Sequence, residues 1–302
     1  MRFFRKRITP SENLSFIAIA VAMDAVLSLI ATFLPLSDIF IILVLPLISA
    51  LTMVLIDKKY ILVYLFSSLI CVSLVTCYDL RETLFYVYPS ILTGILYGIL
   101  VKFKTPVSLL IFFSSLLSLG FNYLSIPLIK AIYSVDMISF IKGVFELTDY
   151  LYVDDIIPTF LFGISLASIS ITHFFISMVF SEFKVSYGNE GVFNIISPIA
   201  SIFFSFLAIL LGFYYVPVAY LFYAFALYFS VFASLNLLSF HRWYLMVLLV
   251  VLLIGSIYSF AIFNSSFPKD SPLLLSSLFF VSVSIPSLLS VFLLKKEGLT
   301  LK

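Results

Sequence analysis

The chain has 302 residues, of which 63% are hydrophobic and only 11% are charged. Soluble domains carry about 25% charged residues, so a chain this apolar cannot cover itself with polar surface and needs lipid as its solvent. The net charge of +2 is too small to indicate a nucleic-acid partner.

Apolar runs long enough to cross a bilayer follow one another along the chain. A spanning helix needs roughly 20 predominantly apolar residues. We therefore predict an all-α, polytopic transmembrane helix bundle of about ten spans. The expected spans are residues 14–35, 39–56, 60–78, 83–101, 106–129, 156–181, 192–213, 217–239, 243–263 and 272–294. The joins near Ser37 and Val216 are short, and a re-entrant hairpin there would reduce the number to eight.

Basic residues collect in alternate loops, as the positive-inside rule requires. With the N-terminus inside, 13 of the 17 Lys and Arg residues fall in cytoplasmic segments. This bias predicts an N-in, C-in topology in the cell (cytoplasmic) membrane. The 13 residues are Arg2, Arg5, Lys6, Arg7, Lys58, Lys59, Lys102, Lys104, Lys184, Arg242, Lys295, Lys296 and Lys302.

The first span carries a carboxylate close to its middle. Asp24 lies in IAIAVAMDAVLSLIATFLP and shares a helix face with Ser28, because side chains four residues apart are neighbours. A charge at the bilayer centre costs about 2.5–3.5 kcal/mol even on insertion scales, so we expect Asp24 to face the protein interior. Two alternatives stay open: a structural hydrogen bond to a neighbouring helix, or the binding of a solute or proton.

Small side chains occupy another face of the same span. Ala18, Ala22 and Ala25 lie within a band of about 60° at 100° per residue. Such a face lets a second helix approach closely, either within this chain or in a partner membrane protein. Gly94 and Gly98 form a GxxxG pair in the fourth span and predict another close contact between helices.

Three further polar residues lie at membrane depth. Asn122 falls toward the outer side of the fifth span and suits a solute pocket. His173 and Asn236 fall toward the cytoplasmic side, where we expect internal hydrogen bonds between helices. The tentative solute site is therefore Asp24, Ser28 and Asn122.

Residues 136–150 belong to the longest outer loop and show helical periodicity. Met137, Phe140 and Val144 share one face, whereas Lys142 and Glu146 lie on the opposite one. This pattern predicts a helix in the membrane interface. It is either a lid over an outward-facing pocket or a plain connector.

No arrangement of residues indicates catalysis or metal binding. Ser165 and His173 share one predicted helix, roughly 12 Å apart along its axis, which is too far for a nucleophile and its base. Cys71 and Cys77 have no clustered histidines beside them. We expect no enzymatic activity, no metal and no cofactor.

Two stretches carry a family resemblance. They are AIAVA, with its AxxxA pair Ala18 and Ala22, and LPLSDIFIILVLPLISALTMVLI followed by DLRETLFYVYPSILTGILYGILVKFK. Over residues 14–181 the chain resembles the YybS-like family of bacterial membrane proteins. That family is in turn similar to the substrate-binding S components of energy-coupling-factor (ECF) vitamin transporters.

The resemblance implies a six-span bundle over residues 1–181 with a solute pocket near the outer face. It also implies that the alanine face of the first helix meets a separate membrane scaffold. S components usually end after six spans, so residues 182–302 form an additional four-span region for which the resemblance implies no function.

Two functional hypotheses follow from these features. The first is a transporter-like, solute-binding membrane subunit with an outward-side pocket. The alternative is a non-transporting scaffold or assembly partner for other membrane proteins. A polar cavity that reaches Asp24 or Asn122 favours the first, and an exposed groove of small or aromatic residues favours the second.

Overall fold

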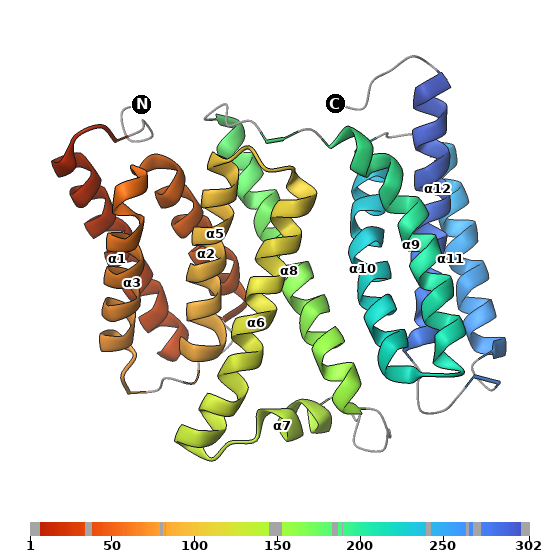
Figure 1. Ribbon diagram of the computed structural model, residues 1–302, viewed down its shortest axis with the longest axis horizontal. Helices are drawn as coiled ribbons and strands as arrows, with labels where there is room; N and C mark the ends of the chain where they lie inside the picture. The colour runs from red at the N-terminus through yellow and green to blue at the C-terminus, as the bar shows by residue number, and fades with distance from the viewer. Residues whose placement is uncertain are drawn as a thin grey trace. The chain divides into compact units, whose positions relative to one another are not determined.

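The computed structural model describes residues 7–33, 38–78, 81, 83–144, 153–182, 187–188, 190–239, 243–263, 266–267 and 273–296. Over these residues the chain is helical and contains no β-strand (Figure 1). The helices are α1 (Pro10–Phe33), α2 (Asp38–Leu55), α3 (Ile61–Val75), α5 (Tyr88–Lys102), α6 (Val107–Tyr133), α7 (Met137–Val144), α8 (Val153–Glu182), α9 (Gly191–Gly212), α10 (Val216–Ser239), α11 (Trp243–Phe263) and α12 (Ser277–Lys296).

Short irregular turns lead into three of these helices. A 3₁₀ turn, Lys58–Tyr60, precedes α3, and another, Leu274–Ser276, precedes α12. A π-helical turn, Thr83–Val87, runs into α5. The N-terminal position of Pro89 in α5 suits a helix start, because a proline there removes no hydrogen bond that the helix needs.

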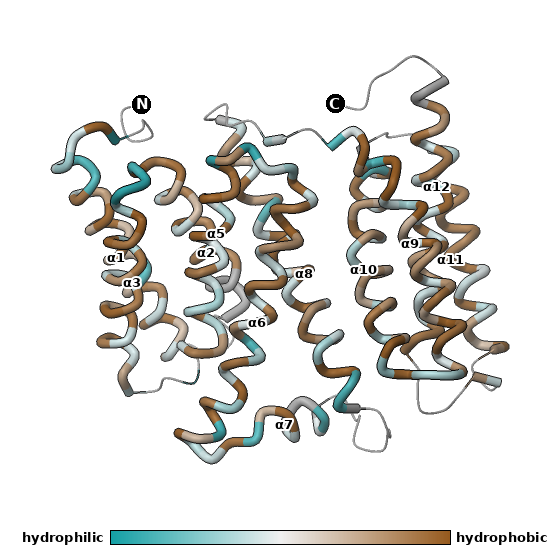
Figure 2. Tube along the Cα trace, viewed as in Figure 1, coloured by the Kyte–Doolittle hydropathy of each residue, from teal (hydrophilic) through white to brown (hydrophobic). Residues whose placement is uncertain are grey.

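The predicted all-α polytopic fold is confirmed. Nine helical segments of the described chain are long and apolar enough to cross a membrane, and α2 contributes the shorter apolar helix Leu43–Leu55. The protein is therefore an integral, multi-pass membrane protein whose apolar helices contact the lipid bilayer. Figure 2 shows hydrophobic residues along the helices and many of the hydrophilic ones near helix ends and turns.

The join at Val216 separates two full-length helices. α9 has 22 residues and α10 has 24, which correspond to about 33 and 36 Å of helix. Both qualify as spans, so the two runs here are no short re-entrant hairpin. The join near Ser37 lies outside the described residues.

The chain divides into two compact units. Unit 1 comprises residues 1–138 and 164–188, and unit 2 comprises residues 139–163 and 189–302. Unit 1 therefore holds α1, α2, α3, α5, α6 and the C-terminal part of α8, and unit 2 holds α9–α12. The predicted division into 1–181 and 182–302 differs in the placement of residues 139–163 and stays a prediction.

In unit 1, α2 and α5 approach each other closely. A Cβ atom added at Gly94 would lie 2.5 Å from the carbonyl oxygen of Pro46, and one at Gly98 would lie 2.5 Å from the Cβ of Met53. Only glycine permits this approach of the two helices. The GxxxG pair thus faces α2, beside buried residues such as Leu45.

One end of unit 1 collects its turns and its basic side chains. The backbone N–H of Arg7 donates to the carbonyl of Leu55 at 2.9 Å, and Lys102 Nζ donates to the carbonyl of Ile56 at 2.6 Å. The N–H of Gly188 donates to the carbonyl of Thr105 at 3.3 Å. These contacts bring the start of α1, the α2–α3 turn, the α5–α6 turn and the end of the unit together. We call this the basic end of unit 1.

Unit 2 is held together by aromatic rings and serines. Phe204 of α9 stacks on Phe229 of α10 with ring centroids 5.6 Å apart. The hydroxyl of Ser201 donates to the carbonyl of Ala226 at 3.4 Å. Small side chains of this kind let membrane helices approach closely and supply hydrogen bonds across their contacts. The serines buried on α9 and α12 are Ser197, Ser201, Ser205, Ser277, Ser282, Ser284, Ser287 and Ser290.

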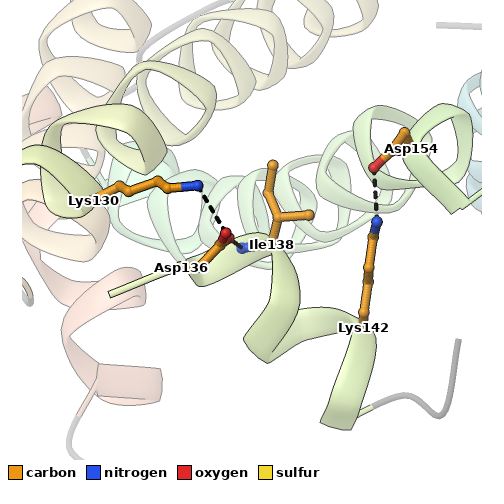
Figure 3. A network of polar contacts seen from close by, with 5 residues as sticks. All are labelled: Lys130, Asp136, Ile138, Lys142 and Asp154. Atoms are coloured by element: carbon orange, nitrogen blue, oxygen red, sulfur yellow. Dashed lines mark hydrogen bonds and ion pairs between the residues drawn. The ribbon is translucent and has the colours of Figure 1, made fainter. Parts of the chain in front are cut away.

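The part of the predicted interfacial segment that the structure describes is helical over α7. Lys130 at the end of α6 pairs with Asp136 at 2.9 Å, and Asp136 Oδ1 accepts the N–H of Ile138 at 3.1 Å (Figure 3). Lys142 pairs with Asp154 at 2.9 Å. These contacts anchor the start of α7 and its lysine. Residues 145–150 lie outside the described residues, and the lid and connector roles both stay predictions.

Candidate functional site

Asp24 lies at the centre of a buried hydroxyl cluster. Its side chain is fully buried in α1, and its Oδ2 accepts hydrogen bonds from Tyr64 Oη at 2.6 Å and Ser68 Oγ at 2.8 Å. Both donors lie on α3, one helical turn apart, so one face of α3 supplies them together. The expectation that Asp24 faces the interior agrees with this geometry.

A third helix extends the cluster. Ser49 of α2 lies 3.0 Å from Tyr64 Oη. Because Tyr64 donates its single hydroxyl proton to Asp24, Ser49 donates to Tyr64. The polar chain therefore runs from Ser49 through Tyr64 to Asp24, and it ties α1, α2 and α3 together inside an apolar surround that includes Leu45 and Val72.

The second carboxylate oxygen of Asp24 has no hydrogen-bond partner in the part of the chain that the structure describes. Asp24 Oδ1 is buried and makes no hydrogen bond to any described residue. A buried acceptor left unsatisfied costs about 1–3 kcal/mol. Chemically, a carboxylate oxygen of this kind can carry a proton or accept a hydrogen bond from a donor that reaches it. Carboxyl groups at membrane depth commonly line solute or proton pathways.

The other two predicted solute-site residues do not converge on this oxygen. Ser28 is fully buried, but its hydroxyl donates to the backbone carbonyl of Asp24 at 2.6 Å and leaves the carboxylate untouched. Asn122 lies on α6 with 8% of its surface exposed, and its Oδ1 also accepts no hydrogen bond from the residues that the structure describes. No hydrogen bond within the described chain joins Asn122 to Asp24 or Ser28.

The alanine face of α1 is turned outward. Ala18 and Ala22 are exposed, and Ala25 is half-buried. On a different face of α1, a groove with a volume of about 630 Å³ runs between its N-terminal half and Ile48–Thr52 of α2, and Ala18, Ala22 and Ala25 do not line it. Its walls are mostly apolar, and Arg7 and Glu12 stand at its polar end. Neither Asp24 nor Asn122 lines this groove.

A second polar cluster joins α5 and α8. Tyr97 Oη lies 2.5 Å from His173 Nδ1 and 3.4 Å from the hydroxyl of Tyr187. The rings of His173 and Tyr187 meet edge to face at 5.5 Å. Burial raises the pKa of Tyr187, which lies in the segment after α8, above its ordinary value. The internal hydrogen bond predicted for His173 is confirmed.

The remaining polar predictions concern α8 and α10. Asn236 Nδ2 donates to the carbonyl of Asn194 at 3.0 Å, so its predicted internal bond is also confirmed. Ser165 is buried and its hydroxyl has no hydrogen-bond partner among the described residues, and His173 is hydrogen-bonded to Tyr97 instead. Within the described residues, no three His, Cys, Asp or Glu side chains form a group that could hold a metal ion.

Tyr64, Ser68 and Ser49 are the functional candidates that the sequence did not reveal. Tyrosine and serine are common in spans, and neither stands out alone. The available signal was the i, i+4 spacing of Tyr64 and Ser68, which places two hydroxyls on one face of an apolar helix.

Comparisons with protein-family models, with curated proteins and with solved structures find no match for this chain.

Proposed function

We propose that this protein is a transporter-like, solute-binding subunit of the cytoplasmic membrane and that Asp24 is its polar centre. The proposal keeps the resemblance to YybS-like proteins and to ECF S components, and it includes no enzymatic activity. The observation that carries it is the unpartnered Oδ1 of Asp24, buried in the middle of a spanning helix. A solute donor or a proton at this oxygen would offset the energetic cost of burying it.

The two carboxylate oxygens of Asp24 would have different roles in this proposal: Oδ2 holds the carboxyl group in place, and Oδ1 meets the solute. Oδ2 is saturated by Tyr64 and Ser68, which fix the orientation of the carboxyl group. Oδ1 is then held in a defined direction without a protein partner. Such preorganisation lowers the entropic penalty when a solute binds.

The test is to identify small molecules that co-purify with the protein. The wild-type chain and Asp24→Asn are purified in mild detergent, and bound molecules are extracted and identified by mass spectrometry. We expect a small molecule near one equivalent in the wild type and its loss in Asp24→Asn at unchanged thermal stability. Ser28→Ala is the matched control and should retain the molecule, because the Ser28 hydroxyl bonds only the helix backbone. The absence of any such molecule, or its equal retention in Asp24→Asn, would contradict the solute-binding role.

A second candidate function is a membrane scaffold that holds a partner protein. The exposed Ala18 and Ala22 and the apolar groove between α1 and α2 favour it. Its expected occupant is a transmembrane helix of the partner, because small side chains allow the closest approach of helix backbones. The two functions separate in one experiment: a scaffold retains a protein partner and no small molecule, whereas a transport subunit retains a small molecule that depends on Asp24.

A further inference from the structure

A second pocket lies at the basic end of unit 1. It has a volume of about 630 Å³ and is lined by Val54, Ile56, Asp57, Lys58, Lys59 and Lys102. Three lysines and one aspartate give its lining a formal charge of +2. The α2–α3 turn and the end of α5 therefore border an open space with a positive wall, where the spans end and the headgroup layer of a bilayer would begin.

The contacts of the lysines define the shape of this pocket. Lys102 is anchored, since its Nζ donates to the carbonyl of Ile56 at 2.6 Å. The ammonium of Lys58 lies 4.8 Å from the ring centroid of Phe103, and that of Lys59 lies 5.2 Å from the ring centroid of Tyr60. Cation–π contacts of this kind steady an ammonium group without neutralising it.

Two of these charges have no counter-ion among the described residues. Lys58 and Lys59 are exposed and form no ion pair with any residue that the structure describes. The pocket also lies at the 3₁₀ turn Lys58–Tyr60, which leads into α3, and the side chain of Asp57 before this turn makes no capping hydrogen bond. The two ammonium groups thus favour an anion at this place.

We propose that this pocket binds an anionic phosphate group, contributed by the headgroup of an acidic phospholipid. Lysine-lined pockets at the ends of membrane helices are suited to phosphate headgroups, because each ammonium near an anionic membrane surface strengthens binding. The half-buried Val54 adds apolar surface to the lining, as expected where a headgroup joins its acyl chains. The site is independent of Asp24 and of the solute-binding role.

The test measures lipid binding to the full chain by native mass spectrometry in detergent. The probes are phosphatidylglycerol, phosphatidylcholine and inorganic phosphate, each added alone and in competition. We expect phosphatidylglycerol to bind, and Lys58→Gln/Lys59→Gln to weaken its binding by roughly tenfold or more. Lys58→Arg/Lys59→Arg keeps both charges and should retain binding. Lys104→Gln/Lys130→Gln removes two charges outside the pocket and should weaken binding less than twofold.

The arms of the experiment distinguish the source of the phosphate. Binding of phosphatidylglycerol that inorganic phosphate does not displace identifies the lipid headgroup. Displacement by inorganic phosphate, with loss of phosphate binding in the glutamine variant, supports the phosphate site but assigns it to a soluble anion. Equal binding of phosphatidylglycerol and phosphatidylcholine overturns the proposal, and so does an equal loss in the control variant. Thermal unfolding of each variant shows whether it is folded.

Discussion

A single carboxyl group joins three helices in the first part of this protein. Asp24 receives two hydroxyl donors from α3, and Ser49 of α2 reaches it through Tyr64. In a bilayer the alternative to such bonds is an unsatisfied polar group in hydrocarbon, so the four side chains depend on one another. Replacement of one member should therefore affect stability according to which partners it leaves unpaired.

Substitutions at Asp24 test this dependence. Asp24→Asn should change the unfolding temperature little, because an amide oxygen can replace Oδ2 and its NH₂ group can occupy the place of the unpartnered Oδ1. Asp24→Leu should destabilise the chain by about 1–3 kcal/mol for each donor left unpaired. Thermal unfolding in mild detergent measures both. A Leu variant as stable as the wild type would show that the cluster has no structural role.

A double-mutant cycle provides the control for this prediction. Tyr64→Phe removes one donor and keeps the ring, so it should cost about 1 kcal/mol. In the Asp24→Leu/Tyr64→Phe variant the two changes should cost less than their sum, because both partners of one buried hydrogen bond are then absent. Strict additivity would mean that the contact contributes nothing.

The sequence predicted part of this cluster and missed the rest for a physical reason. Asp24 was expected to face inward because a mid-membrane carboxylate is costly in lipid, and that expectation rests on one residue alone. Its partners Tyr64 and Ser68 lie about 40 positions away, on another helix. Which helices become neighbours depends on tertiary packing, and no local pattern encodes it. Likewise, the unpartnered Oδ1 becomes visible only when every neighbour is placed.

At the scale of helices, the limits of the spans followed closely from the sequence. The span expected at 243–263 begins and ends as α11 does, and the others differ by a few residues at their ends. Long apolar runs and charged turns are strong local signals. The irregular turns Lys58–Tyr60 and Thr83–Val87 were not predicted, because they depend on how the following helix docks.

The contact between α2 and α5 leads to a prediction for its glycines. Gly94→Ala and Gly98→Ala each place a methyl group within 2.7 Å of atoms on α2, including the carbonyl of Ala50 in the case of Gly98. Overpacking of this kind costs typically about 1–3 kcal/mol. Gly120→Ala is the matched control on a neighbouring span, because a Cβ there meets nothing within 4 Å. Thermal unfolding should show a lower unfolding temperature for the Gly94 and Gly98 variants than for the Gly120 control. An equal unfolding temperature in all three variants would contradict the close contact.

The exposed face of α1 leads to a prediction that separates surface from core. Ala18→Leu and Ala22→Leu should leave the free energy of unfolding within about 0.5 kcal/mol of the wild type, because both positions are exposed. Ala31→Leu on the same helix is buried in the core and should cost about 1–3 kcal/mol. Thermal unfolding in detergent measures all three.

Co-purification then tests the role of that face. If α1 docks on another membrane protein, Ala18→Leu and Ala22→Leu should lose the partner at unchanged stability, since the larger side chains hold the helices apart. Loss of stability in these two variants would mean that the face packs within this chain. The expectation from S components, that this face meets a separate membrane scaffold, would then be wrong. Retention of the partner in both variants would place the contact elsewhere.

At the scale of the whole molecule, the two units are held together by different kinds of contact between side chains. Unit 1 combines glycine contacts with buried hydroxyl and carboxyl groups, whereas unit 2 relies on stacked phenylalanines and on serines facing backbone carbonyls. The candidate groups for solute binding therefore lie in unit 1. The sequence anticipated this difference only in outline, because it showed the polar residues of the first spans but not which side chains they meet.

The orientation of the chain across the membrane is the last prediction. At the basic end of unit 1, the turns carrying Lys59 and Lys104 are linked by the Lys102–Ile56 hydrogen bond, and the positive-inside rule places this end in the cytoplasm. The exposed native Cys77, at the opposite end of α3, should then react with a membrane-impermeant thiol reagent added from outside. In a variant lacking both native cysteines, Lys59→Cys and Lys104→Cys should react only after the membrane is permeabilised.

Unit 2 provides an independent pair of positions for the same measurement. Tyr214 and Trp243 are 81% and 76% exposed; Tyr214 precedes α10, and Trp243 is the first residue of α11, which follows α10 along the chain. A cysteine at Tyr214 should therefore react from outside and one at Trp243 only after permeabilisation. Each permeabilised sample confirms that its cysteine is reactive. Labelling of Lys59→Cys from outside would reverse the orientation of unit 1. Labelling of both unit 2 positions from the same side would contradict the full crossing of α10, because a single spanning helix must place its two ends on opposite faces of the bilayer.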